Sequence, residues 1–235
     1  MMTPKVSILI PAYNQPENLR HLLQTISRQT YKDFEVIITD DSPVSLYRVV
    51  EQFPDLGIIY WWNAGTLGTP ANWNHLLDLA HGTYIKFMHH DDWFRYTYSL
   101  EKFVQALDDH PCIDFCFSAS NAYDEHRNFM HHHTPDISKL VLGTDELLSG
   151  NIIGGPSATI WRRNDLWFDE RMKWLVDMEF YLQMLWKKAD FYYIPDALVG
   201  CMCHDKSVTS QLSTARKSAE WLYLYLKTTG WKLWM

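Results

Sequence analysis

Two pairs of adjacent aspartates, Asp40-Asp41 and Asp91-Asp92, follow apolar runs of the sequence. Carboxylates that come directly after a buried strand are costly unless each finds hydrogen-bond donors or a cation. Oxygen atoms from one or two carboxylates, together with phosphate oxygens, form the usual Mg²⁺ or Mn²⁺ site. A tight turn, in which Asp accepts bonds from nearby backbone N–H groups, is the alternative for either pair. Because two such pairs occur, we favour a site for a divalent cation and a diphosphate.

The first 120 residues alternate between apolar, β-rich runs and helix-like stretches. We expect strands at residues 6–10, 34–39, 57–61, 84–88 and 113–118, and helices at 16–29, 44–53, 70–80 and 98–108. Continuous apolar strands separated by helices predict a parallel sheet that is covered on both faces. Ligands of such sheets lie beyond the carboxyl ends of the strands. Both aspartate pairs fall in loops at those ends, which are 11–15, 40–43, 62–70 and 89–94.

The second half of the chain is less regular. The polar stretch 121–134 contains three consecutive histidines and predicts a solvated hairpin or loop, in which metal capture is not favoured. Strands are expected at 156–163 and 198–204, a short helix from Thr144 to about Gly150, and a helical tail from Thr214. A helix at 175–188 is expected to bury Leu175, Met178, Leu182, Leu185 and Trp186.

No Pro/Ser-rich linker or internal repeat divides the chain. We therefore predict a single domain spanning 1–235, with an N-terminal half (1–120), a second half (121–212) and a helical aromatic tail (213–235).

Composition excludes several classes of protein. The formal net charge of −7 argues against nucleic-acid binding, which needs a basic surface. The four cysteines are spaced as Cys112/Cys116 and Cys201/Cys203, which is not the spacing of a zinc site, and we expect buried thiols that share a strand face. No secretory signal and no apolar stretch of about 18 residues is visible, so a cytoplasmic protein with reduced thiols is expected.

Five segments carry a resemblance to a known family. They are residues 6–14 (V-S-I-L-I-P-A-Y-N), 39–42 (T-D-D-S), 63–65 (N-A-G), 72–74 (N-W-N) and 82–92 (G-T-Y-I-K-F-M-H-H-D-D). In this order and with these gaps they resemble the family 2 glycosyltransferases. The resemblance runs from about residue 6 to 209. It implies an α/β, GT-A fold in which a mostly parallel nucleotide-binding sheet is flanked by helices and followed by a smaller, irregular acceptor-side half.

The resemblance also implies an activity. An enzyme of this kind moves a sugar from a nucleotide-diphosphate donor to an acceptor hydroxyl, with inversion. A UDP-sugar is the favoured donor, and Mn²⁺ or Mg²⁺ is expected to assist the reaction. The acceptor is expected to be a saccharide or lipid-linked saccharide of surface polysaccharide or glycolipid assembly.

Roles of individual residues follow by position in the resemblance. Tyr13 is expected to stack on the nucleotide base and Asp41 to accept from a ring N–H. Asp91 and Asp92 are expected to meet the ribose, the metal and the pyrophosphate. His89 stands where the family often has another acid and is not expected to be a ligand. The other residues expected to bind the nucleotide-sugar are Pro11, Ala12, Asn14, Asn63, Asn72 and Lys86. For Lys86 the alternative is a snorkelling side chain at the margin of the sheet.

A late segment that begins at His204 also resembles the family. His204 is a third metal ligand or a pyrophosphate contact in this interpretation, and a structural histidine in the alternative. Gly154-Gly155 resembles the family's acceptor-side loop, or simply forms a turn.

The catalytic base is expected at the start of the helix after residue 175. Val176-Asp177-Met178-Glu179 matches in part an acidic motif that opens a helix in the family's inverting members. Asp177 is the expected base, which takes the proton of the acceptor hydroxyl. The alternative is a carboxylate that only complements the positive helix N-terminus, where its pKa would fall and weaken it as a base. Glu179 is the second candidate.

Two other functions remain open. Val176 replaces the motif's first acid, which leaves room for a non-catalytic nucleotide-sugar-binding or assembly protein. A sugar nucleotidyltransferase is less favoured because residues 11–14 are not the Gly-rich, basic phosphate loop of such enzymes.

The tail carries Lys217, Lys227 and Lys232 among many aromatic residues. It either packs on the domain, which we favour, or rests on the inner face of the membrane.

Overall fold

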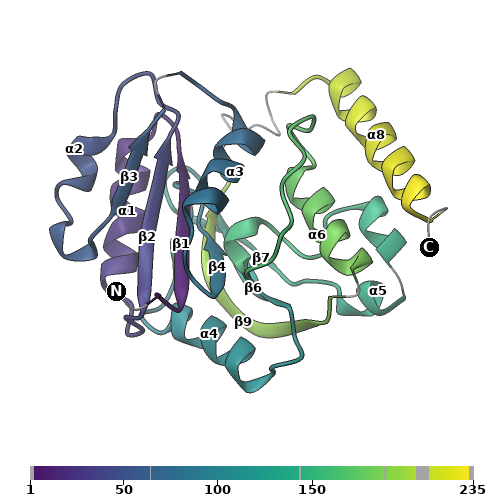
Figure 1. Cartoon of the computed structure of the whole chain (residues 1–235), viewed down its shortest axis with the longest axis horizontal. Coiled ribbons are helices and arrows are strands. Elements are labelled where there is room, and N and C mark those ends of the chain that lie inside the picture. The colour runs from purple at the N-terminus through teal and green to yellow at the C-terminus, as the bar shows by residue number, and fades with distance from the viewer. Residues whose placement is uncertain (1–2, 64, 143, 188, 205–211, 233–235) are drawn as a thin grey trace.

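The computed structural model describes residues 3–63, 65–142, 144–187, 189–204 and 212–232. Its N-terminal half is the predicted parallel sheet, with strand order β3-β2-β1-β4. The strands are β1 (Val6–Ala12), β2 (Phe34–Asp40), β3 (Ile59–Trp62) and β4 (Tyr84–Phe87). Every residue of β1 is buried, because helices cover both faces of the sheet (Figure 1).

The covering helices bury one apolar side each. Residues of α1 (Pro16–Ser27) and α4 (Ser99–Asp109) join the core on one face of the sheet. Those of α3 (Thr69–Leu79) and α6 (Val176–Trp186) join the core on the other. The helix predicted at 44–53 is reduced to α2 (Tyr47–Val50) and a 3₁₀ turn, η1 (Pro54–Leu56).

The sheet continues into the second half with mixed strand directions. β8 (Thr159–Arg162) is antiparallel to both β4 and β6 (Phe115–Tyr123), and β9 (Phe191–Met202) is parallel to β6. β5 (Trp93–Phe94) pairs with β9, and β7 (Phe129–His133) forms the predicted hairpin with β6. One nine-stranded sheet therefore crosses both halves.

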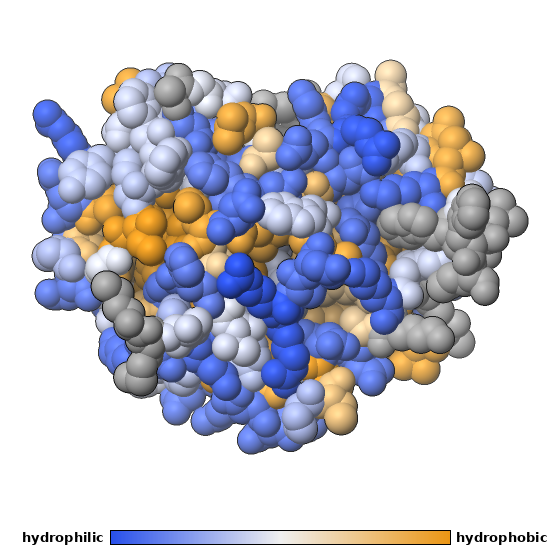
Figure 2. Space-filling model, in the orientation of Figure 1, coloured by the Kyte–Doolittle hydropathy of each residue, from blue (hydrophilic) through white to orange (hydrophobic). Residues whose placement is uncertain are grey.

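Short helices and the tail complete the second half. They are α5 (Ile137–Leu142), the 3₁₀ turns η2 (Thr144–Ser149) and η3 (Pro156–Ala158), and α8 (Thr214–Lys232). Leu224 and Thr228 of α8 are buried, so the favoured packing of the tail on the domain is confirmed for these residues. Figure 2 shows a largely hydrophilic face, with hydrophobic residues gathered over β2 and β3 and at the outer side of α8.

Three local predictions differ from the structure: two strands are present with other bounds, and the prediction for the cysteines was wrong. The strand expected at 156–163 starts as η3, because the Thr159 hydroxyl and backbone close a turn onto the carbonyl oxygen of Pro156. The strand expected at 198–204 is the end of the longer β9. The cysteine pairs do not share buried strand faces: Cys116 is buried in β6, whereas Cys112 and Cys203 are exposed outside the strands.

Candidate functional site

A cleft of about 480 Å³ lies beyond the carboxyl ends of β1, β2 and β4. This is the edge at which ligands of parallel sheets bind. Besides His89 and His90, the cleft is lined by eight residues that the sequence had singled out: Pro11, Ala12, Tyr13, Asp41, Asn72, Asp91, Asp177 and His204. Segments that lie up to 190 residues apart in the sequence thus meet in one place.

The corner expected to hold the nucleotide base is preorganised around Asp41. Its Oδ1 accepts from Asn63 Nδ2 at 2.7 Å and its Oδ2 accepts from the backbone N–H of Gly68 at 3.0 Å. Asn63 also donates to Asn72 Oδ1 at 2.9 Å, so it supports the corner from behind the cleft wall. Tyr13 is 46% exposed at this corner, which leaves its ring free to stack on a base.

Asp40, in contrast, forms the tight turn that was the alternative for the first aspartate pair. Its Oδ1 accepts from the backbone N–H of Ser42 at 2.9 Å, and its Oδ2 accepts from Leu46 N at 2.8 Å and from the Tyr60 hydroxyl at 2.5 Å. These bonds shape residues 42–46 as a loop, which is why the predicted helix begins only at Tyr47. Asp40 therefore needs no cation.

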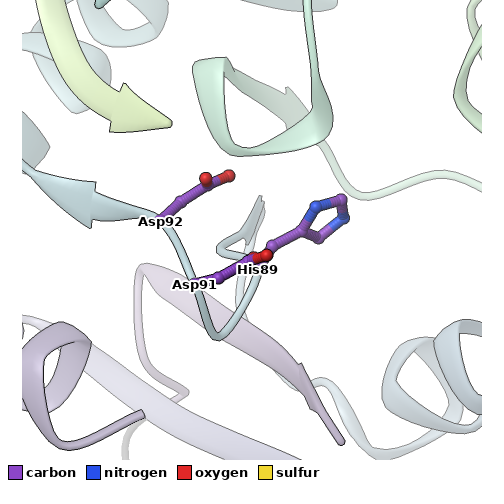
Figure 3. Close-up of side chains that lie close together, drawn as sticks. All are labelled: His89, Asp91 and Asp92. Atoms are coloured by element: carbon purple, nitrogen blue, oxygen red, sulfur yellow. The ribbon is translucent and has the colours of Figure 1, made fainter. Parts of the chain in front are cut away.

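The second aspartate pair forms a group with metal-ligand geometry. One ligand atom from each of His89, Asp91 and Asp92 lies within 4.8 Å of the others (Figure 3). His204 Nε2 lies 3.0 Å from Asp91 Oδ2, so the predicted histidine also reaches the site. Asp92 is buried behind Asp91, and its Oδ1 accepts from Met202 N at 3.2 Å.

Two carboxyl groups lie close together in this buried group, which makes it costly to ionise both. Burial and the neighbouring Asp91 carboxylate raise the pKa of Asp92 to about 8. Burial would also raise the pKa of Asp91, but the hydrogen bond with His204 and the nearby His90 and His89 rings hold it below its usual range. Burial lowers the pKa of His89 to about 4, which leaves a neutral imidazole, and its buried Nε2 has no hydrogen-bond partner among the described residues. Two carboxyl groups and a neutral imidazole fit a divalent cation.

Asp177 stands at the start of α6 and lines the cleft. Its Oδ2 accepts from Asn151 Nδ2 at 2.8 Å and its Oδ1 accepts from the backbone N–H of Met178 at 2.9 Å. Burial raises the pKa of Asp177 to about 6, so desolvation outweighs the lowering expected at a helix N-terminus. A carboxyl with this pKa is a better base near neutral pH than an ordinary Asp.

Asn151 is a site residue that sequence reasoning missed. Besides holding Asp177, its Nδ2 donates to the Gly154 carbonyl oxygen at 3.1 Å and its Oδ1 accepts from Gly154 N at 2.9 Å. It thus joins the candidate base to the loop that resembles an acceptor-side loop. An Asn three residues before a Gly-Gly pair signals a turn and gives no hint of this second contact.

Glu179, the second candidate for the base, points elsewhere. It is fully buried, its Oε1 lies 2.6 Å from Lys227 Nζ of α8, and its Oε2 accepts from Gln183. It does not line the cleft. Its role is to join α6 to the tail helix.

Lys86 is likewise not at the sheet margin. It is completely buried, its Nζ donates to the carbonyl oxygens of Ser157 and Phe87, and it lies 4.6 Å from the centre of the Phe103 ring. Burial lowers the pKa of Lys86 to about 7. Asn14 also lies outside the cleft lining: it has a left-handed φ of 56°, and its backbone N–H donates to Ser42 Oγ at 2.8 Å.

The tail helix contributes to the cleft indirectly. Glu220 of α8 accepts from the backbone N–H groups of Lys173 at 3.0 Å and Trp174 at 2.8 Å, both of which line the cleft. It also accepts from Leu175 N, which precedes α6. The tail therefore fixes the segment that leads into Asp177. The remainder of the late segment, residues 205–209, lies outside the described residues.

Comparison with known proteins gives one family match that covers most of the chain. The model of the family described as Glycosyl transferase family 2 matches residues 7–188. An uncharacterized glycosyltransferase of Methanocaldococcus jannaschii is 27% identical over 99% of this chain and 81% of its own length. A β-1,3-glucosyltransferase of Escherichia coli, WfaP, whose name gives UDP-Glc as donor and α-D-GlcNAc-diphosphoundecaprenol as acceptor, is 34% identical over 38% of this chain and 36% of its own.

Two solved structures share the fold. TarS of Staphylococcus aureus (residues 1–349) in complex with UDP-GlcNAc aligns with a TM-score of 0.72 and 20% identity, covering 89% of this chain and 62% of TarS 1–349. The mannosyltransferase PcManGT of Pyrobaculum calidifontis, in complex with GDP-Man and Mn²⁺, aligns with a TM-score of 0.63 and 16% identity, covering 86% and 57%. This chain thus spans about three fifths of each, and the likeness confirms the predicted GT-A, α/β fold.

Proposed function

We propose that this chain, which belongs to glycosyl transferase family 2 and is a glycosyltransferase, moves a sugar from a UDP-sugar to the hydroxyl of a saccharide or lipid-linked saccharide, with inversion. The observation that carries the proposal is the cleft itself. It brings together a base-binding corner at Tyr13 and Asp41, an acidic turn at Asp91, and a carboxyl of raised pKa at Asp177.

The comparisons support the donor and acceptor classes. TarS was solved with UDP-GlcNAc, and WfaP is named for a UDP-sugar donor and an undecaprenol-diphosphate-linked acceptor. The fixed position of Asp41 also supports the arrangement, because its carboxylate lines the cleft and is held there by the backbone N–H groups of Leu67 and Gly68.

In the proposed reaction the acceptor oxygen attacks the anomeric carbon as the bond from that carbon to the diphosphate oxygen breaks. Asp177 accepts the proton of the acceptor hydroxyl, and Asn151 holds the carboxylate in place. Attack opposite the departing diphosphate inverts the anomeric centre. His89, Asp91 and Asp92, with His204 beside Asp91, are the residues proposed to hold Mn²⁺ or Mg²⁺. A bound divalent cation would stabilise the negative charge that develops on the leaving diphosphate.

We expect UDP and UDP-sugars to raise the melting temperature, in the presence of Mn²⁺, more than GDP, dTDP or their sugars do. A ligand at about 100 times its Kd stabilises the native state by about 2.7 kcal/mol. Differential scanning fluorimetry measures the shift, and release of UDP on addition of an acceptor separates an enzyme from a protein that only binds the nucleotide-sugar. The variant Asp41→Ala should reduce the shift. Equal stabilisation by GDP- or dTDP-sugars would contradict the proposed donor.

The outer side of α8 is proposed to rest on an anionic membrane surface where a lipid-linked acceptor is found. Leu222, Tyr225 and Leu226 are each more than half exposed and share one side of this helix by their spacing, whereas Leu224 is buried. Apolar and aromatic side chains on such a helix insert at the headgroup boundary. No helix in the described part of the chain combines the length and the hydropathy needed to cross a bilayer.

Flotation with vesicles that contain anionic lipid tests this contact. The double variant Leu222→Ser/Leu226→Ser should lose most of the flotation, because it removes the apolar face without touching the buried side of α8. Truncation is unsuitable, since it would remove Glu220 and Lys227 from the domain. Val44→Ser is the matched control, because Val44 is 77% exposed on a distant loop. Flotation of the double variant at the wild-type level would rule out this face.

A further inference from the structure

A second cleft, of about 610 Å³, lies outside the candidate active site. Its walls are the outward side of α3, the segment 167–171, and residues of α6 and α8. The side chains that bear on its chemistry are His75, Asp78, Trp167, Glu170, Arg171 and Gln183. None of them belongs to the machinery proposed above.

Trp167 gives this cleft a rigid aromatic platform. Its side chain is 46% exposed, and its backbone is held by Gln183 Nε2, which donates to the Trp167 carbonyl oxygen at 2.8 Å. An indole ring exposed in a cleft lined mainly by polar side chains offers an apolar face rimmed by hydrogen-bonding groups. Sugar rings match this combination, because their C–H faces stack on aromatic rings while their hydroxyls bond to carboxylates, amides and imidazoles.

The charges of the cleft favour a neutral ligand over a phosphate. Its two cations are already engaged: Arg171 Nη2 lies 2.8 Å from Asp169 Oδ2, and Lys227 Nζ lies 2.6 Å from both Asp169 and Glu179. Asp78 and Glu170 add further negative charge. An incoming diphosphate would meet repulsion here, whereas hydroxyl groups would find acceptors.

The second cleft adjoins the candidate active site across a thin partition. Trp73 lines the active-site cleft, Phe168 lines the second cleft, and their rings meet edge to face with centroids 5.0 Å apart. Asn74 fixes the partition, since it donates to the Phe168 carbonyl oxygen at 3.0 Å and accepts from Phe168 N at 2.9 Å. Farther along the same segment, Arg171 lines the second cleft and Lys173 the active site.

We propose that the second cleft binds the saccharide chain of the acceptor, with the Trp167 indole stacked on a sugar ring two or more residues away from the hydroxyl that reacts at Asp177. This inference rests on the proposed function, because it assigns the remote part of the acceptor. It makes Trp167 a determinant of acceptor length and leaves the donor site unaffected.

The variant Trp167→Ala tests the proposal, with Phe129→Ala as the control. Phe129 is an exposed aromatic of β7 that lines neither cleft. The KM for tetrasaccharide acceptors should rise about tenfold in Trp167→Ala, the upper end of what an aromatic contact contributes. The KM for monosaccharide acceptors, the KM for the donor and kcat should remain as in the wild type. An unchanged preference for longer acceptors would overturn the proposal.

Direct binding separates this inference from the proposed function. Saturation-transfer NMR can detect binding of free tetrasaccharides without donor or metal. The panel consists of tetrasaccharides of glucose and tetrasaccharides of N-acetylglucosamine, each of defined linkage. At least one tetrasaccharide should bind to the wild type, to Asp177→Asn and to Phe129→Ala, but not to Trp167→Ala. Absence of binding by the whole panel, or equal binding by Trp167→Ala, would overturn the second site. Loss of vesicle flotation in Trp167→Ala would also overturn it, because Trp167 would then belong to a membrane surface. Failure of UDP release in the wild type would count against the proposed function alone.

Discussion

Replacing Asp177 with Asn is expected to lower kcat by about 10²- to 10⁴-fold, which is the usual contribution of a positioned general base. Asn has the same shape and can still accept from Asn151, but it cannot take a proton. The Kd of the UDP-sugar should stay within about twofold of the wild-type value, because the base acts on the acceptor in the transition state. Steady-state kinetics and calorimetry measure the two quantities on the same preparation.

The pH dependence adds a second readout for Asp177. Burial raises its pKa to about 6, and only the deprotonated carboxylate is a base. Wild-type kcat/KM should therefore fall as the pH drops below about 6, and this acidic limb should be absent from the residual activity of Asp177→Asn. The matched control is Glu179→Gln, which should lower the melting temperature by weakening the contact with Lys227 while the folded enzyme keeps its kcat. If Glu179→Gln lost activity and Asp177→Asn did not, the base role would move to Glu179.

Removal of divalent metal by EDTA is expected to abolish transfer, and Mn²⁺ or Mg²⁺ should restore it. Asp91→Asn should lower kcat/KM by about 10³-fold, because the charge on the leaving diphosphate would lose several kcal/mol of stabilisation. Electron paramagnetic resonance of free Mn²⁺ should report weaker binding by Asp91→Asn and by His89→Ala, independently of activity. His89 is included because one of its ring nitrogens lies within 4.8 Å of a carboxylate oxygen of Asp91 and of Asp92.

The first aspartate pair provides the control for the metal prediction. Asp40 is bonded to Ser42, Leu46 and Tyr60, so Asp40→Asn should lower stability without changing the Mn²⁺ dependence of the folded protein. Full activity in chelator, or Mn²⁺ affinity unchanged in Asp91→Asn, would remove the acidic turn from the proposed mechanism.

Much of the N-terminal half could be predicted from the sequence, because its signals are local. The apolar runs of β1, β2 and β4 and the helices between them specify a parallel sheet, and such a sheet places its loops at one edge. Order along the chain was thus enough to bring Tyr13, Asp41 and Asp91 to one cleft.

The sequence does not show which aspartate of each pair lines the cleft. Asp40 and Asp41 are neighbours of the same type, and only the positions of Tyr60 and Asn63 turn one into a buried turn residue and the other into a cleft residue. In the same way, Lys86 follows the expected strand pattern but is buried with the rest of β4, where Ser157 and Phe103 enclose it.

By itself, then, the sequence determined the fold class, the family and the order of the loops that form the site, because periodicity and short motifs depend on residues that are close along the chain. The tertiary structure alone decided that Asp177 has a raised pKa, that Asn151 holds it, that Glu179 belongs to the tail contact, and that Glu220 fixes the segment before α6. Burial and hydrogen-bond geometry set these properties, and both depend on residues that lie 26 to 48 positions apart in the sequence and meet only when the chain folds.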